Sequence, residues 1–178
     1  ETEIYPVFKD KSPVLWVQND FKPENPNVIL DGSEIAPYKT IAEAFAAIPD
    51  DDNTLRGWRI NVLNADENEV IDIDELLGQK VKYITISNES DDEMWVAGMN
   101  VSADVPVVVR YFGFAPVEGP IQETDEVENV ITLSGRRLTL DNCEIQGGDR
   151  NRGAMVNSGE LVLINTYVNS CSAGDNGD

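Results

Sequence analysis

The chain contains no histidine among its 178 residues. Histidine is the commonest general base and the commonest zinc ligand in proteins. A Ser-His-Asp triad, a Cys-His pair and any metal site built on imidazole are therefore excluded within this sequence. Cysteine is scarce as well: only Cys143 and Cys171 occur, too few for a disulfide framework. We expect Cys143 to be a buried free thiol that is not bonded to Cys171.

Long apolar runs and positive charge are also lacking. No stretch of about 20 apolar residues occurs, so the sequence predicts no membrane-inserted segment. Lys and Arg total 13 against 33 Asp and Glu, a formal net charge of −20. Such a surface repels phosphate backbones and anionic lipid heads, which argues against nucleic-acid and membrane-surface partners. It also repels polyanionic polysaccharides unless a cation bridges them.

What the chain does contain is enough apolar sequence for one folded domain. Hydrophobic residues make up 41% and charged residues 26%, unlike a disordered tail. Residues 1–30 hold four prolines and are expected to be irregular, apart from a strand-like run at 14–17. We therefore divide the chain into an irregular segment, 1–30, and a folded unit, 31–178, that we expect to be truncated at its C-terminal end.

One short amphipathic helix is expected at about residues 40–48. Thr40 stands where an N-cap should, and Glu43 follows three positions later, as in a capping box. Four apolar residues then fall on one helical face: Ile41, Ala44, Phe45 and Ile48. Pro49 ends the helix, and no second helix is expected after it.

Short β-branched runs separated by Gly, Asn, Asp and Ser fill the rest of the chain. Near the C-terminus one constant shift along the sequence superimposes Leu138 on Leu161, Leu140 on Leu163, Asn142 on Asn165 and Ile145 on Val168. The same shift places residues 131–134 on residues 154–157. The apolar pairs are expected to stack in columns, and the two asparagines to bond through their amides at a bend. This pattern predicts an all-β fold, a right-handed parallel β-helix (solenoid) with a short N-terminal capping α-helix at about 40–48.

Two segments resemble known families. Residues 31–44, with D-G-S and P-Y-K-T-I-A-E-A, followed by I-N-V-L at 60–63, resemble the opening of pectin-lyase-like β-helix proteins. Residues 153–165, G-A-M-V-N-S-G-E-L-V-L-I-N, resemble the repeats of adhesin-like proteins and polymorphic outer-membrane proteins. The resemblance covers roughly residues 28–178 and is more specific for fold than for function.

The resemblance implies a secreted or cell-surface protein. The favoured interpretation is a non-catalytic, adhesin-like segment that serves as a structural stalk or as a binding surface for a glycan or for a host or neighbour-cell surface protein. The alternative is the N-terminal portion of a polysaccharide lyase or glycoside hydrolase whose active residues lie outside this chain. A third alternative is a trimeric phage tailspike segment. Further copies of the chain could also associate end to end through the open C-terminal coil.

Candidate binding residues are few, and no catalytic residue is assigned. The Gly-rich loop at 147–153 carries Asp149, Arg150 and Arg152, which are the residue types that β-helix lyases use with calcium. Its structural interpretation is an ordinary solvated turn. Tyr167 alternates outward and is the best exposed aromatic side chain for stacking on a sugar. No cofactor is predicted; calcium is left open, with carboxylates of Asp141 and Asp149 or of residues 175–178 as its ligands.

Overall fold

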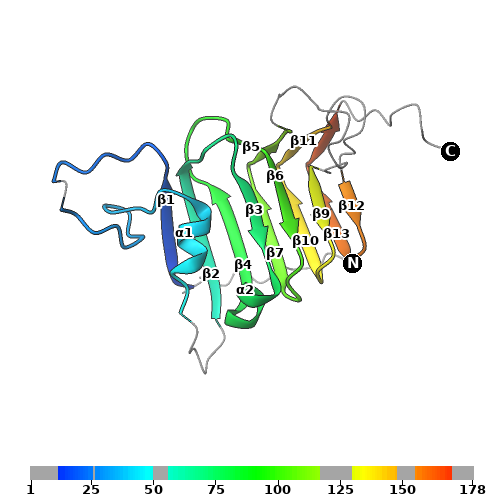
Figure 1. Cartoon of the computed structure of the whole chain (residues 1–178). Helices are drawn as coiled ribbons and strands as arrows, with labels where there is room; N and C mark the ends of the chain where they lie inside the picture. Colours follow the sequence, from blue (N-terminus) through cyan, green and yellow to red (C-terminus); the bar gives the residue numbers. More distant parts are fainter. Residues whose placement is uncertain (1–11, 26, 50–55, 117–129, 148–154, 170–178) are drawn as a thin grey trace, which may run out of the picture.

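The computed structural model describes residues 12–25, 27–49, 56–116, 130–147 and 155–169. This part of the chain is mostly strands, arranged in three parallel sheets around a common core (Figure 1). The first sheet has six strands in the order β1 (Val14–Gln18), β2 (Arg56–Asn64), β4 (Val81–Asn88), β7 (Pro106–Arg110), β10 (Arg137–Asp141) and β13 (Glu160–Ile164). The second has four: β5 (Trp95–Val96), β8 (Gly113–Phe114), β11 (Glu144–Gln146) and β14 (Tyr167–Asn169). The third also has four: β3 (Val70–Ile73), β6 (Gly98–Val101), β9 (Ile131–Leu133) and β12 (Met155–Asn157).

The expected fold class, a single right-handed parallel β-helix with one capping helix, is wrong. The structure has three separate small parallel sheets and two short helices instead. The hydrogen-bonded ladders stop where the chain bends between sheets, because residues at these bends leave the extended conformation: Tyr111, Asn142 and Asn165 have φ values of 61°, 53° and 46°. The chain passes from the first sheet to the second and then to the third, so residues far apart in sequence become neighbours.

The core lies between the three sheets and follows the alternation of each strand. In β10, Leu138 and Leu140 are fully buried, whereas Thr139 between them is half-buried. The expected columns are confirmed, because Leu138 pairs with Leu161, Leu140 with Leu163 and Ile145 with Val168. The last member of two of these columns is much more open: Leu163 is 44% and Val168 48% exposed. The strands β12, β13 and β14 stand at one end of their sheets.

The register of β12 differs from the expected one by a single position. Ile131 pairs with Met155 and not with Ala154, whereas Leu138 of β10 pairs with Leu161 of β13 as expected. The reason is the connection to the next strand. Residues 134–136 separate β9 from β10, whereas only Ser158 and Gly159 separate β12 from β13. A constant shift cannot follow a turn that becomes shorter by one position.

The expected helix is confirmed as α1 (Ile41–Ala46), and it covers one end of the core (Figure 1). The hydroxyl of Thr40 accepts a hydrogen bond from the Glu43 backbone N–H at 3.0 Å, and the Glu43 carboxylate accepts one from the Lys39 N–H at 2.8 Å. The four predicted apolar residues of this face are all buried: Ile41, Ala44, Phe45 and Ile48. The carboxylate of Glu69, from the turn before β3, also accepts the N–H of Ile41 at 2.8 Å.

A second helix, α2 (Glu75–Lys80), contradicts the expectation that no helix follows Pro49. Its start carries a signal that apolar periodicity does not detect: the Asp74 carboxylate accepts the N–H of Leu77 at 2.7 Å, as an N-cap. Only Leu77 is buried, so the helix presents no apolar stripe. In the described part of the chain, no helix is long and apolar enough to span a membrane.

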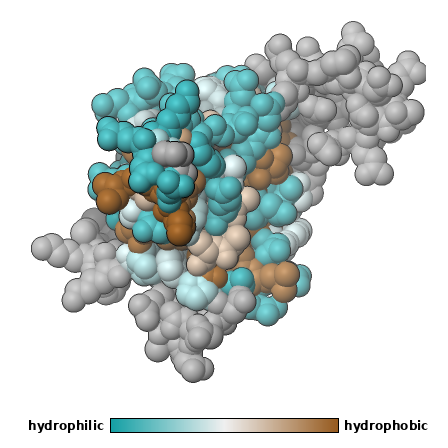
Figure 2. Space-filling view, turned by 60° about the vertical axis from the view of Figure 1, so that its left-hand side comes forward, coloured by the Kyte–Doolittle hydropathy of each residue, from teal (hydrophilic) through white to brown (hydrophobic). Residues whose placement is uncertain are grey.

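The segment between β1 and α1 extends away from the sheets (Figure 1). It is tied back by the Lys39 ammonium, which donates to the backbone carbonyls of Asn19 and Phe21. Ile29 and Ile35 on this segment are 85% and 84% exposed. Figure 2, which brings this end of the molecule forward, shows isolated hydrophobic patches within a hydrophilic surface. The strand-like run at 14–17 is confirmed, because β1 pairs in parallel with β2.

Candidate binding groove

The bend between the first and second sheets recurs on three successive strands. Tyr111, Asn142 and Asn165 occupy equivalent positions there, all with positive φ. Asn tolerates this left-handed conformation better than most residues, because its short polar side chain can bond locally. The amide of Asn142 donates to the neighbouring Asp141 carboxylate at 2.8 Å. This bond replaces the amide–amide bond to Asn165 that the sequence suggested, and the bend is fixed by backbone conformation.

Directly after this bend, the second sheet presents a row of four outward positions. Trp95 pairs with Gly113, Gly113 with Glu144, and Glu144 with Tyr167. The next residue of each strand points into the core, as the buried Val96 and Phe114 show. Because neighbouring strands lie roughly 4.8 Å apart, the two aromatic residues at the ends of this row are separated by about 14 Å.

Gly113 is the position that makes room for the indole of Trp95. A Cβ atom at residue 113 would lie 2.3 Å from ring carbons of Trp95. Any side chain there would have to displace the ring. The indole is thus packed against backbone on one side, which fixes its orientation while it stays partly exposed.

A hollow of about 590 Å³ lies over this row and the adjoining bend; we call it the corner groove. Its walls come from residues 88–95, 111–113, 142–144, 165 and 167. A second hollow of about 220 Å³, lined by residues 63–65, 67, 90 and 92–95, shares Trp95 with it. The indole of Trp95 therefore contributes to both hollows, which together extend along one edge of the molecule.

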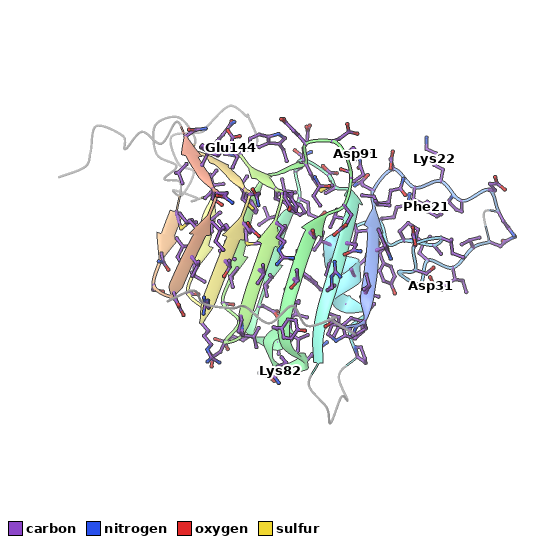
Figure 3. All side chains as sticks on the ribbon, turned by 180° about the vertical axis from the view of Figure 1, so that it is seen from behind. Phe21, Lys22, Asp31, Lys82, Asp91 and Glu144 are labelled. Atoms are coloured by element: carbon purple, nitrogen blue, oxygen red, sulfur yellow. The ribbon has the colours of Figure 1, made fainter. Side chains whose placement is uncertain are left out.

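The acidic loop at 89–93 forms one wall of the corner groove, and Asn88 holds it in place. Asn88 is buried, its amide nitrogen donates to the carbonyl of Asp92 at 2.9 Å, and its amide oxygen accepts from the N–H and hydroxyl of Ser90 at 2.8 and 2.7 Å. A buried amide with both ends bonded restricts the loop's conformation. Figure 3 shows Asp91 of this loop and Glu144 of β11 at the same edge of the molecule.

Five carboxyl groups line the corner groove: Glu89, Asp91, Asp92, Glu93 and Glu144. No Lys or Arg belongs to the groove lining within the described residues. Glu89 is balanced by Arg59, whose guanidinium lies 3.7 Å from its carboxylate. The carboxylate of Glu144 accepts hydrogen bonds at one oxygen from the amides of Gln146 at 3.1 Å and Asn169 at 3.0 Å, which orients it along the row.

The thiol of Cys143 lies beneath the groove and is not available as a nucleophile. It is 2% exposed and donates to the carbonyl of Val109 at 3.5 Å. Burial raises the pKa of Cys143, so the reactive thiolate is disfavoured. The prediction of a buried free thiol is confirmed; Cys171 lies outside the described residues.

Only some of the site residues predicted from the sequence lie in the described part of the structure. Tyr167 is exposed, as predicted, at 70%, and it lines the corner groove. Asp149, Arg150 and Arg152 lie outside the described residues, as do residues 175–178. Asp141 faces Arg110, whose Nε lies 3.5 Å from its carboxylate. Within the described residues, no group of three or more acidic or cysteine side chains is placed to hold a metal ion, and no cofactor is identified.

Sequence reasoning misses three parts of this groove. Sequence patterns do not identify Trp95, the acidic loop at 89–93 or Glu144 as site residues. The row that joins them has uneven sequence spacing, because its steps run from 95 to 113, from 113 to 144 and from 144 to 167. Only the last step matches the repeat that the sequence reveals.

Comparison with known proteins gives no relative: no family model, no curated protein and no solved structure matches this chain. The groove must therefore be interpreted from its own chemistry.

Proposed function

We propose that this chain is a non-catalytic glycan-binding segment of a secreted or cell-surface protein, and that the corner groove holds the saccharide. The observation that carries the proposal is the row Trp95, Gly113, Glu144, Tyr167, with an aromatic side chain at each end and a carboxylate between them. Aromatic faces stack on the apolar faces of sugar rings, and carboxylates and amides bond to hydroxyl groups.

The dimensions of the groove support an oligosaccharide. A volume of about 590 Å³ lies in the range typical of small-molecule sites, roughly 300–1,000 Å³. Its continuation past Trp95 into the second hollow suits a chain-like ligand that passes over the indole. The packing of Trp95 on Gly113 also limits the entropy lost when a ligand stacks on that ring.

The chemistry of the lining supports binding without turnover. The chain contains no histidine, so no imidazole base faces the hollow. The thiol of Cys143 is buried beneath the lining and is not presented to a ligand as a nucleophile. The groove thus offers hydrogen-bond acceptors and stacking faces to a ligand.

The proposal is tested by titrating the chain with neutral oligosaccharides of three to five units, such as β-1,4-linked glucose, xylose and N-acetylglucosamine oligomers, by isothermal calorimetry. Trp95→Ala and Tyr167→Ala should each weaken binding of the preferred oligomer about tenfold or more. Trp58→Ala serves as the matched control, because Trp58 does not line the groove and should leave affinity unchanged.

Two outcomes would contradict the proposal. Absence of binding to every oligosaccharide tested, neutral or amine-bearing, would contradict a glycan ligand. Release of shorter products by the purified chain would replace the non-catalytic function with that of a lyase or hydrolase.

A further inference from the structure

The corner groove has a charge of a single sign. Four of its carboxyl groups, Asp91, Asp92, Glu93 and Glu144, have no cationic partner among the described residues, whereas Glu89 faces Arg59. No lysine of the described part lines the groove: Lys82 is at the opposite edge of the molecule, and Lys22, on the segment before α1, is at the same edge as Asp91 but outside the lining (Figure 3). The excess of negative charge therefore faces the hollow directly.

This charge acts together with the aromatic row. The outward position of Glu144 is flanked two strands away by Trp95, across Gly113, and on the neighbouring strand by Tyr167. Both amide donors to Glu144 bond to the same carboxylate oxygen, Oε1, so its other oxygen is left for a ligand. A cation in the groove would lie beside a carboxylate and near the face of an aromatic ring, the two groups that attract ammonium ions most strongly.

We infer that the ligand of the corner groove is an amine-bearing glycan, one whose sugar rings carry free ammonium groups rather than carboxylate, sulfate or acetamide groups. This inference rests on the proposed function, because the sugar rings stack on Trp95 and Tyr167 while the ammonium groups meet the carboxylates. A concave surface lined by one charge raises the local concentration of the opposite charge, and salt weakens that effect. Uronate-bearing glycans are repelled for the same reason.

The test compares two oligomers that differ only in whether the amine is free or acetylated, the β-1,4-linked tetramers of glucosamine and of N-acetylglucosamine. Affinity is measured by calorimetry at mildly acidic pH and low salt, where the amines are protonated. The glucosamine tetramer should bind about tenfold or more tightly than its acetylated counterpart, and raising the salt concentration to about 0.5 M should remove most of this advantage.

The variant Asp91→Asn/Asp92→Asn/Glu93→Gln, combined with Glu144→Gln, should abolish the preference for the free amine, so that the two tetramers bind with equal affinity. The control Glu34→Gln/Asp72→Asn/Asp104→Asn neutralises exposed carboxylates outside the groove lining and should keep the preference. Trp95→Ala should weaken both tetramers.

The outcomes separate the inference from the function beneath it. Equal affinity for the two tetramers overturns the inference but agrees with a glycan-binding groove. If neither tetramer binds, both the inference and the proposed function are contradicted. A third outcome is that only the glucosamine tetramer binds, that Trp95→Ala leaves its affinity unchanged, and that the control variant weakens it as much as the groove variant does. Such binding would be general electrostatic attraction to an acidic protein. That result also overturns the inference.

Discussion

Trp95 and Gly113 occupy paired positions on β5 and β8, and the indole ring fills the space in which a side chain at residue 113 would begin. The glycine has an ordinary φ angle, so its small size rather than its conformational freedom is what the site requires. This contact turns an exposed tryptophan into an oriented surface.

Gly113→Ala should therefore disturb Trp95 specifically. The added methyl group lies within 2.3 Å of the ring, and such overpacking costs about 1–3 kcal/mol. In a Trp95→Ala background the same substitution should be nearly neutral, because the obstructing ring is gone. Chemical unfolding of the four proteins in this cycle measures the coupling. Equal costs in both backgrounds would show that the glycine serves another purpose.

Leu140 and Leu163 should respond differently to truncation although they are adjacent members of one column. Leu140 is fully buried and Leu163 is 44% exposed. Leu140→Ala should lower the free energy of unfolding by about 2–5 kcal/mol, and Leu163→Ala by about 1 kcal/mol or less. Urea denaturation of both variants checks this. Similar losses would mean that β13 is covered as completely as β10.

These columns also show which strand pairings can be predicted from the sequence. Leu138, Leu140 and Ile145 can be paired with their partners because two copies of one spacing survive near the C-terminus. The register between β9 and β12 cannot be predicted in this way, since the turn from β12 to β13 is one position shorter than the turn from β9 to β10. The helix α1 is readable from its cap and apolar face, whereas α2 has a cap but buries only Leu77.

The groove is harder to predict from the sequence than the core, for a physical reason. Its aromatic row depends on strand pairing between residues 95, 113, 144 and 167, and no local pattern records that pairing. Tyr167 can be identified because outward alternation is a property of its own strand. Trp95 cannot, because its exposure depends on a glycine on a different strand. The division into three sheets likewise depends on bends such as the one at Asn142.

Glu69 should make the stability of the protein depend on pH. Burial raises the pKa of Glu69 above its ordinary value of 4.5, although the N–H groups of Ala42 and Ile41 bond to it and lower the pKa in part. Its Oε2 atom is buried without a hydrogen bond. A raised pKa in the folded state favours the protonated form. The stabilisation that comes from protonated Glu69 is therefore fully present below about pH 4.5 and is lost as pH rises through the folded pKa.

Glu69→Gln keeps an acceptor for the N–H of Ile41 and removes the charge. The free energy of unfolding of Glu69→Gln, relative to that of the wild type, should increase from about pH 4 to about pH 7. Glu69→Ala removes the acceptor as well as the charge and should stay about 1 kcal/mol less stable than Glu69→Gln at either pH. Thermal unfolding of the three proteins at both pH values tests this. A constant difference between Glu69→Gln and the wild type would contradict it.

The end of the sheets at β12, β13 and β14 should promote association between copies of the chain. Leu163 and Val168 are about half exposed there, and strands at a sheet edge offer unpaired backbone groups. We expect concentration-dependent self-association in light scattering coupled to size exclusion, reduced by Leu163→Lys. Ile35→Lys, at an exposed position on the segment before α1, is the control. A monomer at every concentration would refute the expectation.

The central claim, that the corner groove binds a glycan, is tested most directly by the indole N–H signals of the three tryptophans in a ¹⁵N-labelled sample titrated with the preferred oligosaccharide. Trp95 lines both hollows, whereas Trp16 and Trp58 line neither. The Trp95 signal should shift in a saturable manner while those of Trp16 and Trp58 stay in place. Saturable binding that leaves the Trp95 signal unmoved would place the ligand elsewhere and contradict the claim.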